Sequence, residues 1–369
     1  MRKKNNNIEE KFYLASQWQL IMRKFKHHRL ALVGVCVLAI FVFMGIFCEF
    51  IAPYDTEFRM ASYRNTPPQR IHFYDKNTGF HLRPFVYGWK MERDFETGRR
   101  IYTPDKTKIY PIYFFIRTEP YKLWKIIPMN IKLFGVKEGV LYLLGADDLG
   151  RDLFSRLVYA TRISLSVGLV GVALTFVLGC ILGGISGYYG GTVDMIIQRS
   201  IEFLQSIPTI PLWMGLAAAL PPKWPPLKIY FFILLILSLI NWVYLARVVR
   251  SRLLAVREED FVMASKVAGA SEAWMIRKHL IPSLTSYLIV NITLSVPNMI
   301  LGETALSFLG IGLQPPVVSW GVLLKDAQDL QKIALYPWQL VPALFVFITV
   351  LCLNFVGDGL RDAADPYKM

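Results

Sequence analysis

Six long stretches without a single Asp, Glu, Lys or Arg dominate the pattern of hydrophobic and polar positions. They lie at residues 30–48, 163–193, 203–222, 229–246, 279–302 and 333–357. The core of a bilayer is about 30 Å thick, so a helix that crosses it needs about 20 apolar residues. The pattern therefore predicts an all-α polytopic membrane protein with six transmembrane helices, of which the third is interrupted by Pro208 and Pro211.

The first stretch is predicted to be a retained anchor helix. It is longer than the apolar core of a secretory signal, and no small-x-small cleavage site follows it. Before it, Trp18, Met22 and Phe25 fall on one helical face, which indicates either an interfacial anchor or, with equal weight, a partly ordered tail. The predicted segments are a tail (1–29), a first transmembrane helix (30–52), an insert (53–157), a core with the remaining transmembrane helices (158–357) and a C-terminal tail (358–369).

The charges between the stretches predict the orientation. The tail before residue 30 carries eight Lys and Arg against two acids, and residues 247–278 carry seven against four. Cytoplasmic segments next to a membrane are enriched in Lys and Arg. We expect the protein to lie in the inner membrane of the cell. With six crossings, both basic segments and both termini are then expected to lie on the cytoplasmic side. The insert (53–157) is then extracytoplasmic, because loops of that length are translocated largely regardless of charge.

The insert is expected to form a small, ordered β-rich or mixed subdomain. Residues 109–116 combine the aromatic and β-branched side chains that are typical of strands. The histidines at positions 72 and 81 are close in sequence, but a structural or surface role is the favoured interpretation. No catalytic constellation is apparent in the insert.

Composition and charge exclude several classes of function. The net charge of +14 first indicates a nucleic-acid partner, but its distribution fits membrane topology and anionic lipid headgroups instead. The five histidines have no zinc-site spacing, and the cysteines lie within or beside apolar stretches, at positions 36, 48, 180 and 352. We therefore expect no metal site, no bound cofactor and no nucleic-acid partner.

A few polar residues fall inside the predicted spans. Burying such groups against lipid is costly, so they are expected to face a partner helix or a watery path. Hydrogen bonding between helices is the favoured interpretation for each of them taken singly. As candidates for a translocation path we consider Asn241, Asn291, Ser295, Asn298 and Glu303.

Small residues recur at every fourth position of the second stretch. Such a stripe lets two helix backbones approach closely in lipid. It predicts tight helix packing and says nothing by itself about a substrate. The stripe consists of Gly171, Thr175, Gly179, Gly183 and Gly187.

The loop between the fourth and fifth stretches has the features of a short helix. Its acidic start at residues 258–260 suits the positive end of a helix dipole, and Gly269 can adopt the left-handed geometry that ends a helix. A second helical stretch is expected over residues 272–280, and Pro282 can start the next span. A short helix between two spans suits docking into a groove of another protein. An interfacial loop without a partner remains the alternative of equal weight.

The loop (250–282) resembles the EAA loop of ABC-importer permeases, the coupling element that docks on the ATPase subunit. The resemblance places the Glu of that pattern at Met263, the Ala pair at Ala264 and Ser265, the Gly at Gly269 and the Pro at Pro282. Met263 departs from the pattern, so a Glu-specific contact is not implied. The implied coupling residues are Met263, Ala264, Ser265, Ala268, Gly269 and Pro282.

Three other segments resemble the second permease subunit of oligopeptide and dipeptide importers. They are residues 144–156 (LGADDLGRDLFSR), 303–321 and 357–366. Together with the loop they occur in the order of that family, and the likeness covers about 1–52 and 144–369. The longer insert is similar to the branch of the family that has an enlarged periplasmic segment.

The resemblance implies an ABC-importer permease fold and a permease subunit that moves oligopeptides or dipeptides across the cytoplasmic membrane. The implied partners are a second homologous permease, two ABC ATPases that hold ATP and Mg²⁺, and an extracytoplasmic peptide-binding protein. This chain has no Gly-rich Lys-Ser/Thr phosphate loop, so we expect no ATP hydrolysis and no enzyme activity in it.

Other functions stay open at this point. Related permeases carry nickel, glycosides or modified peptides. A stand-alone secondary transporter would need inverted repeats with broken helices or membrane-buried carboxylates, and the sequence shows neither clearly. An extracytoplasmic enzyme built on the insert would need a nucleophile–base pair or a metal cluster.

Overall fold

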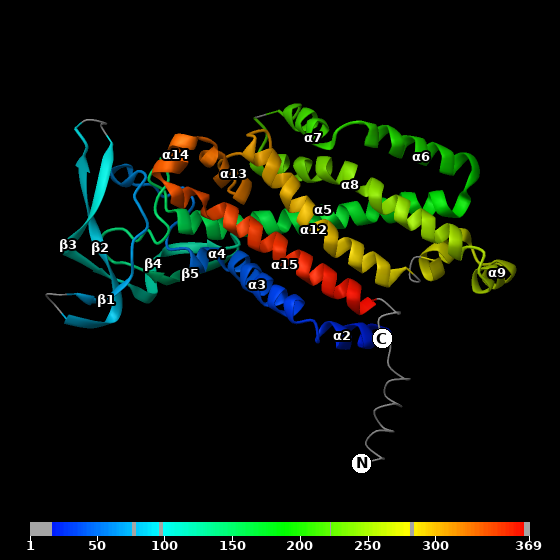
Figure 1. Cartoon of the computed structure of the whole chain (residues 1–369), viewed down its shortest axis with the longest axis horizontal. Coiled ribbons are helices and arrows are strands. Elements are labelled where there is room, and N and C mark those ends of the chain that lie inside the picture. Colours follow the sequence, from blue (N-terminus) through cyan, green and yellow to red (C-terminus); the bar gives the residue numbers. More distant parts are fainter. Residues whose placement is uncertain (1–16, 76–78, 96–98, 222, 281–283, 365–369) are drawn as a thin grey trace, which may run out of the picture. The chain divides into compact units, whose positions relative to one another are not determined.

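The computed structural model describes residues 17–75, 79–95, 99–221, 223–280 and 284–364. Two compact units are formed, one from residues 1–39, 166–303 and 347–369, the other from residues 40–165 and 304–346. Helices dominate, and among the described residues the strands lie in the second unit (Figure 1). The longer helices are α2 (Gln17–Phe25), α3 (Arg29–Ile46), α5 (Leu153–Tyr189), α6 (Gly191–Ser206), α7 (Thr209–Ala218), α8 (Pro226–Val256), α9 (Asp260–Val267), α12 (Thr285–Phe308) and α15 (Val341–Ala364).

Short helical elements complete the described helices. They are α4 (Cys48–Ile51), η1 (Ala61–Tyr63), α10 (Glu272–Met275), the π-helical turn η2 (Ile276–Leu280), α13 (Trp320–Lys325), η3 (Asp326–Gln328), α14 (Leu330–Leu335) and η4 (Pro337–Leu340). The predicted second helix of the loop (272–280) is thus an α-helical turn followed by a π-helical turn.

Five helical segments among the described residues are long and apolar enough to cross a membrane. They correspond to five of the six predicted spans, but the ends differ by several residues. α5 begins at Leu153, ten residues before its charge-free stretch, and Glu303 lies within α12 instead of closing it. The fifth segment runs from Pro337 to Ala364.

The prediction of one helix over residues 203–222 is wrong. α6 ends at Ser206 and α7 covers only 10 residues, about 15 Å at 1.5 Å per residue. Pro208 causes the break, because the residue before a proline is disfavoured in the helical conformation, and Ile207 is extended with φ −95° and ψ 129°. α6 packs on α8 through Ile201, and α7 also contacts α8, so the two form one interrupted helix along α8 (Figure 1).

The small-residue stripe of α5 packs as predicted. A Cβ added to Gly183 would lie 2.5 Å from the carbonyl oxygen of Ala246 in α8, and one added to Gly187 would lie 2.8 Å from Leu253 Cβ. At Gly171 the side chain of Met299 in α12 lies as close, at 2.8 Å. The backbones of these helices therefore approach one another only because no side chain intervenes.

The lead-in helix α2 packs on protein with a face that includes Phe25 of the predicted face, but with Ile21 in place of Met22. Ile21 and Phe25 are each 8% exposed and cluster with Ala31 and with Ala363 of α15. Met22, expected on the apolar face, is 48% exposed. The contact with α15 comes from tertiary packing, which a helical-wheel argument about one segment does not include.

The insert is β-rich, as predicted. One antiparallel sheet has the order β1–β2–β3, and β4 pairs with β5 in a second, two-stranded sheet. The strands are β1 (His72–Asp75), β2 (Gly79–Arg93), β3 (Arg100–Pro111), β4 (Tyr113–Leu123) and β5 (Ile127–Gly135). A core of Val86, Ile112 and Leu141 underlies them.

Residues 109–116, whose side chains are typical of strands, cover the end of one strand and the start of the next. β3 ends at Pro111 and β4 begins at Tyr113. Between them, Ile112 is 4% exposed, and its amide donates a hydrogen bond to the carbonyl of Pro84 at 2.8 Å. A proline has no amide hydrogen for a strand ladder, so the pairing changes partner at this point.

Candidate functional site

α9 (Asp260–Val267) is a short exposed helix that follows α8 (Figure 1). Asp260 lies in its first turn, where the helix dipole favours an acid. At its end Gly269 adopts φ +81°, and the amides of Gly269 and Ala270 donate to the carbonyls of Lys266 (3.0 Å) and Ser265 (3.1 Å). This is the left-handed helix termination that a glycine favours, so the prediction of a short helix ended by Gly269 is confirmed.

One buried side chain anchors α9 to its neighbours. Val262 is 3% exposed and belongs to an apolar cluster with Leu253 of α8, Leu284 and Leu288. Leu288 lies in α12 and Leu284 precedes it. Val262 therefore lies in one apolar cluster with the end of α8 and with residues at the start of α12.

The remaining surface of α9 combines exposed apolar side chains with two charges. Met263 is 48% exposed and Val267 87%, and Ala264, Ala268, Asp260 and Lys266 are also exposed. Ser265 is half-buried and donates to the carbonyl of Phe261 at 2.9 Å. The predicted coupling residues from position 263 to 269 thus form one continuous helix and turn. Pro282 lies outside the described residues.

A polar ion-pair cluster ties α6 to α8 in the same unit. Arg250 of α8 binds both carboxylate oxygens of Asp194 in the first turn of α6, with Nε 2.5 Å from Oδ1. The hydroxyl of Ser186 in α5 donates to the same carboxylate. Sequence analysis missed this cluster. The only available signal was an acid and an arginine at the ends of two charge-free stretches.

Three of the five candidate path residues meet around one cavity. Asn241 of α8 and Ser295 and Asn298 of α12 line a space of about 100 Å³ together with Thr175 of α5. Asn241 Nδ2 lies 3.9 Å from the sulfur of Met299. The cavity thus brings polar side chains of three helices together.

The other two candidates lie elsewhere on α12. Asn291 donates from its side chain to the carbonyl of Tyr287 at 2.9 Å, and its own carbonyl accepts from Ser295 at 2.7 Å. Glu303 is fully buried, more than one turn beyond Asn298. The structure therefore does not join all five residues into one path.

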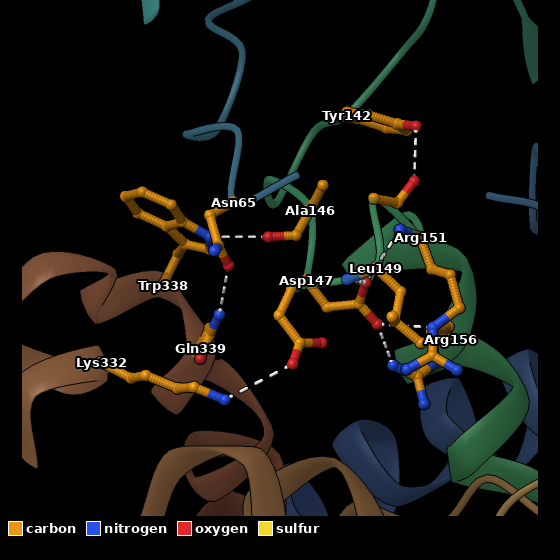
Figure 2. A network of polar contacts seen from close by, with 12 residues as sticks. Asn65, Tyr142, Ala146, Asp147, Leu149, Arg151, Arg156, Lys332, Trp338 and Gln339 are labelled. Atoms are coloured by element: carbon orange, nitrogen blue, oxygen red, sulfur yellow. Dashed lines mark hydrogen bonds and ion pairs between the residues drawn. The ribbon is translucent and has the colours of Figure 1, made fainter. Parts of the chain in front are cut away.

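The segment 144–156 carries a dense polar network in the second unit (Figure 2). One oxygen of Asp147 accepts from Arg151 Nε at 2.7 Å and from Arg156, while the other accepts the amides of Leu149 and Arg151 at 2.9 Å each. Gly145 and Gly150 take positive φ values of 81° and 79°, which lets the loop fold around the carboxylate. The likeness to a family motif pointed to this segment, but not to these partners.

The same network reaches residues far along the chain. Lys332 lies 3.4 Å from Asp148, and Trp338 Nε1 donates to the carbonyl of Ala146 at 3.2 Å (Figure 2). Gln339 also donates to Asn65 at 3.1 Å. These contacts fix the loop against α14 and η4.

Carboxylate oxygens of Asp147, Asp148 and Asp326 all lie within 4.8 Å of one another, close enough to hold a cation. Burial and the nearby Asp148 carboxylate raise the pKa of Asp326 above its usual range. However, Arg151 and Arg156 bind Asp147, and Lys332 binds Asp148. Two of the three acids therefore belong to an ion-pair network.

The chain matches the family model "Binding-protein-dependent transport system inner membrane component" over residues 176–368, just over half of its length. The chain belongs to this family. A second model, "N-terminal TM domain of oligopeptide transport permease C", matches residues 16–68. The family match spans α9 and the cavity residues of α8 and α12, and the N-terminal match spans α2 and α3.

Several characterised relatives of this transport-component family are similar to the chain. The dipeptide transport system permease protein DppC of Lactococcus lactis subsp. cremoris is 33% identical, covering 95% of this chain and 91% of that protein. The oligopeptide transport system permease protein OppC of Bacillus subtilis is 29% identical over 95% and 90%. OppC of Haemophilus influenzae is 40% identical over 61% and 70%.

The family and the helices agree on the class of protein. Five segments are long and apolar enough to span a bilayer, and the family consists of membrane components of transport systems. The chain is therefore a multi-pass membrane permease of ABC-transporter type. Among solved structures, an inward-facing methionine ABC transporter MetNI resembles it with a TM-score of 0.45 and 18% identity, over 57% of this chain and 97% of that one.

Proposed function

We propose that this chain is one permease subunit of an ATP-driven ABC importer that moves oligopeptides or dipeptides across the cytoplasmic membrane. The observation that carries the proposal is α9, a short helix with an exposed apolar face that one buried residue, Val262, anchors between two membrane helices. A helix presented in this way suits the groove of a partner protein. The peptide permeases among its relatives support the choice of cargo.

The proposed partners are two ABC ATPases, a second permease subunit and an extracytoplasmic peptide-binding protein. ATP and Mg²⁺ belong to the ATPases, and this chain contributes no catalytic residue. When the ATPases close, they displace α9, and Val262 passes the displacement to α8 and α12. The Arg250–Asp194 pair then carries it to α6. Such a change needs only that the partner contacts differ between the two states.

The proposed path for the peptide runs past the polar residues of α8 and α12. Asn241, Ser295 and Asn298 already share a small cavity. Asn291 and Glu303, the latter fully buried in this structure, are the proposed path residues on either side of this group along α12. Neutral amides and hydroxyls suit a path for peptides, because they offer hydrogen bonds to a backbone without holding any one side chain strongly.

In the proposed orientation both termini and α9 face the cytoplasm, and the β-rich insert lies outside. The basic tail and the basic segment 247–278 support this orientation through the enrichment of Lys and Arg on the cytoplasmic side. α6 and α7 count together as one crossing, so the number of crossings stays at six. The membrane is then the inner, cytoplasmic membrane.

Purification in mild detergent followed by reconstitution tests this function. We expect the tagged chain to co-purify with two ATPases and a second permease. Proteoliposomes that hold this complex, with the binding protein outside, should take up radiolabelled di-, tri- or longer peptides only with ATP. Uptake of nickel or a glycoside in place of peptides would identify the other branch of the family. Uptake without any ATPase would instead indicate a secondary transporter.

A further inference from the structure

The three-stranded sheet of the insert carries a cleft that plays no part in the proposed coupling or path. It has a volume of about 270 Å³ and lies where the segment before β1 crosses β2 and β3. It is lined by the half-buried rings of Tyr87 and Trp89 of β2, here called its floor, and by the exposed side chains of Arg70 and Lys106, here called its rim. Trp89 is opposite Pro104 in the antiparallel register.

The cleft is held open by a buried amide. Gln69 is 6% exposed, and its Nε2 donates to the carbonyls of Tyr87 (3.1 Å) and Val140 (3.2 Å). Its Oε1 accepts from the amide of Tyr142 at 2.6 Å. Because every polar atom of this side chain is satisfied, the segment that bears Arg70 is fixed against the sheet and is not free to close over the cleft.

Three side chains of the cleft, those of Trp89, Arg70 and Lys106, offer hydrogen-bond donors, and His72 lines the cleft beside them. Trp89 Nε1 is buried and has no hydrogen-bond partner among the described residues. In the same part of the chain, the exposed side chains of Arg70 and Lys106 form no ion pair that would neutralise them. The hydroxyl of Tyr87 is already used, because it donates to Asp75 at 2.6 Å. A buried donor without an acceptor is costly, so the cleft suits a ligand rich in acceptors.

The acids of the sheet are already partnered. Asp75 accepts from Tyr87, Glu92 pairs with Lys90 at 2.9 Å, and Asp105 accepts from the hydroxyl and the amide of Thr107. These hydrogen bonds keep the pKa of Asp105 below its usual range, whereas the bond to Asp75 raises the pKa of Tyr87. No acid of these strands is therefore left to neutralise Arg70 or Lys106 in the cleft.

We propose that this cleft is the docking site for an extended acidic segment of the extracytoplasmic binding protein. A carboxylate of that segment would lie between Arg70 and Lys106, and a backbone carbonyl would accept from Trp89 Nε1. Two features favour a protein partner. An apolar aromatic floor with a charged rim is typical of protein interfaces, and the insert as a whole has 18 basic and 12 acidic residues, a surplus of six positive charges that attracts an acidic surface.

This inference rests on the proposed function, because it needs a binding protein and an extracytoplasmic insert. The test uses the complete transporter complex in nanodiscs and the purified binding protein of the same system. Association is measured by biolayer interferometry at 50 and 500 mM NaCl. The variants are Trp89→Phe, which removes the donor but keeps the ring, Arg70→Gln and Lys106→Gln. Lys122→Gln is the matched control, since Lys122 is an exposed lysine on β4 with the same charge change.

We expect Trp89→Phe to weaken binding roughly tenfold at both salt concentrations, through faster dissociation. Arg70→Gln and Lys106→Gln should slow association about two- to fivefold at 50 mM NaCl and have little effect at 500 mM, because salt screens rim charges. Lys122→Gln should bind like the unaltered complex. Melting temperatures establish that each variant is folded, and the two rim variants alter only exposed side chains.

The outcomes separate the two proposals. Equal binding by all variants would overturn the cleft as the docking site and leave the importer function intact. No binding even by the unaltered complex would overturn both. A third experiment measures the binding of tri-alanine to the complex in the absence of the binding protein. The peptide has either a free or an amidated C-terminus. Trp89-dependent binding of the free acid alone would assign the cleft to the cargo and would also overturn the docking proposal.

Discussion

At the scale of single residues, backbone conformation is what matters at Gly269, and burial is what matters at Asp152. Gly269 has a positive φ of 81° and open space around its Cα, so its conformation, not its size, is what the chain needs there. Asp152 is 2% exposed just before α5, with its carboxylate accepting from the amide and the hydroxyl of Ser155. Gly269 lies at the end of α9, and Asp152 lies directly before the first residue of α5.

Replacing Gly269 with proline should uncouple ATP hydrolysis from uptake. Proline requires φ near −65° and has no amide hydrogen for the bond to Lys266, so α9 loses its termination at a local cost of about 1–3 kcal/mol. We expect peptide uptake in proteoliposomes to be lost while the complex still assembles. Gly269→Asn is the control, because asparagine tolerates the left-handed region and should retain most uptake. Unchanged uptake by the proline variant would refute the coupling role.

The stability of the chain should depend on pH through Asp152. Burial raises its pKa to about 7, against about 3.9 in an unfolded chain. The folded state therefore holds the proton more tightly, and its stability falls as pH rises from about 4 to 7, by roughly 4 kcal/mol at most. Asp152→Asn does not ionise, so its melting temperature should change less between pH 5 and pH 8. Parallel pH profiles for the two proteins would contradict this prediction.

At the scale of elements, the close approach of α5 and α8 depends on the small-residue stripe. Adjacent glycines offer a matched test of it. A Cβ at Gly183 would lie 2.5 Å from a backbone oxygen of Ala246, whereas a Cβ at Gly184 would find its nearest neighbour, Ile276, at 3.7 Å. The two glycines are adjacent in α5, and the comparison is between the helix faces on which they lie.

Gly183→Ala should therefore force α5 and α8 apart and destabilise the protein by about 1–3 kcal/mol. Gly184→Ala should be neutral or should stabilise α5 by up to about 1 kcal/mol, since alanine favours a helix over glycine. Melting curves of the two purified variants check the difference. Equal melting temperatures would show that the helices have room to adjust.

At the scale of the whole molecule, the proposed topology places α9 and the insert on opposite sides of the membrane. This expectation depends on the number of membrane crossings between the insert and α9. We count α6 and α7 together as one crossing, in place of the single helix predicted there. The charge asymmetry of the loops supports it.

Single cysteines should report this topology. In a background without the cysteines at positions 36, 48, 180 and 352, Glu119→Cys on β4 should react with a membrane-impermeant maleimide in intact cells. Ser265→Cys on α9 should react only after permeabilisation. Both positions are at least partly exposed, so access and not burial decides the labelling. The reverse pattern would invert the orientation.

Much of the candidate site was predictable because it is local. The acidic start of α9, its small residues and Gly269 lie within a dozen positions, and capping rules act over that distance. The interruption by Pro208 could also be read in advance, although its effect, two helices in place of one, could not. The Asp194–Arg250 pair and the cleft at Trp89 gave no local signal, since their members lie 56 or about 20 residues apart.

The residue pattern alone predicted five of the segments that can cross a bilayer, the β-rich insert and the position where α9 ends. Each follows from neighbouring residues, because charge-free length, strand propensity and a left-handed glycine are properties of short segments. Only the tertiary structure decided that Asn241 meets Asn298, that Arg250 holds Asp194, and that Asp147 binds two arginines. Those pairings depend on how each helix is rotated about its axis and on how the loops fold, and packing between distant segments sets both.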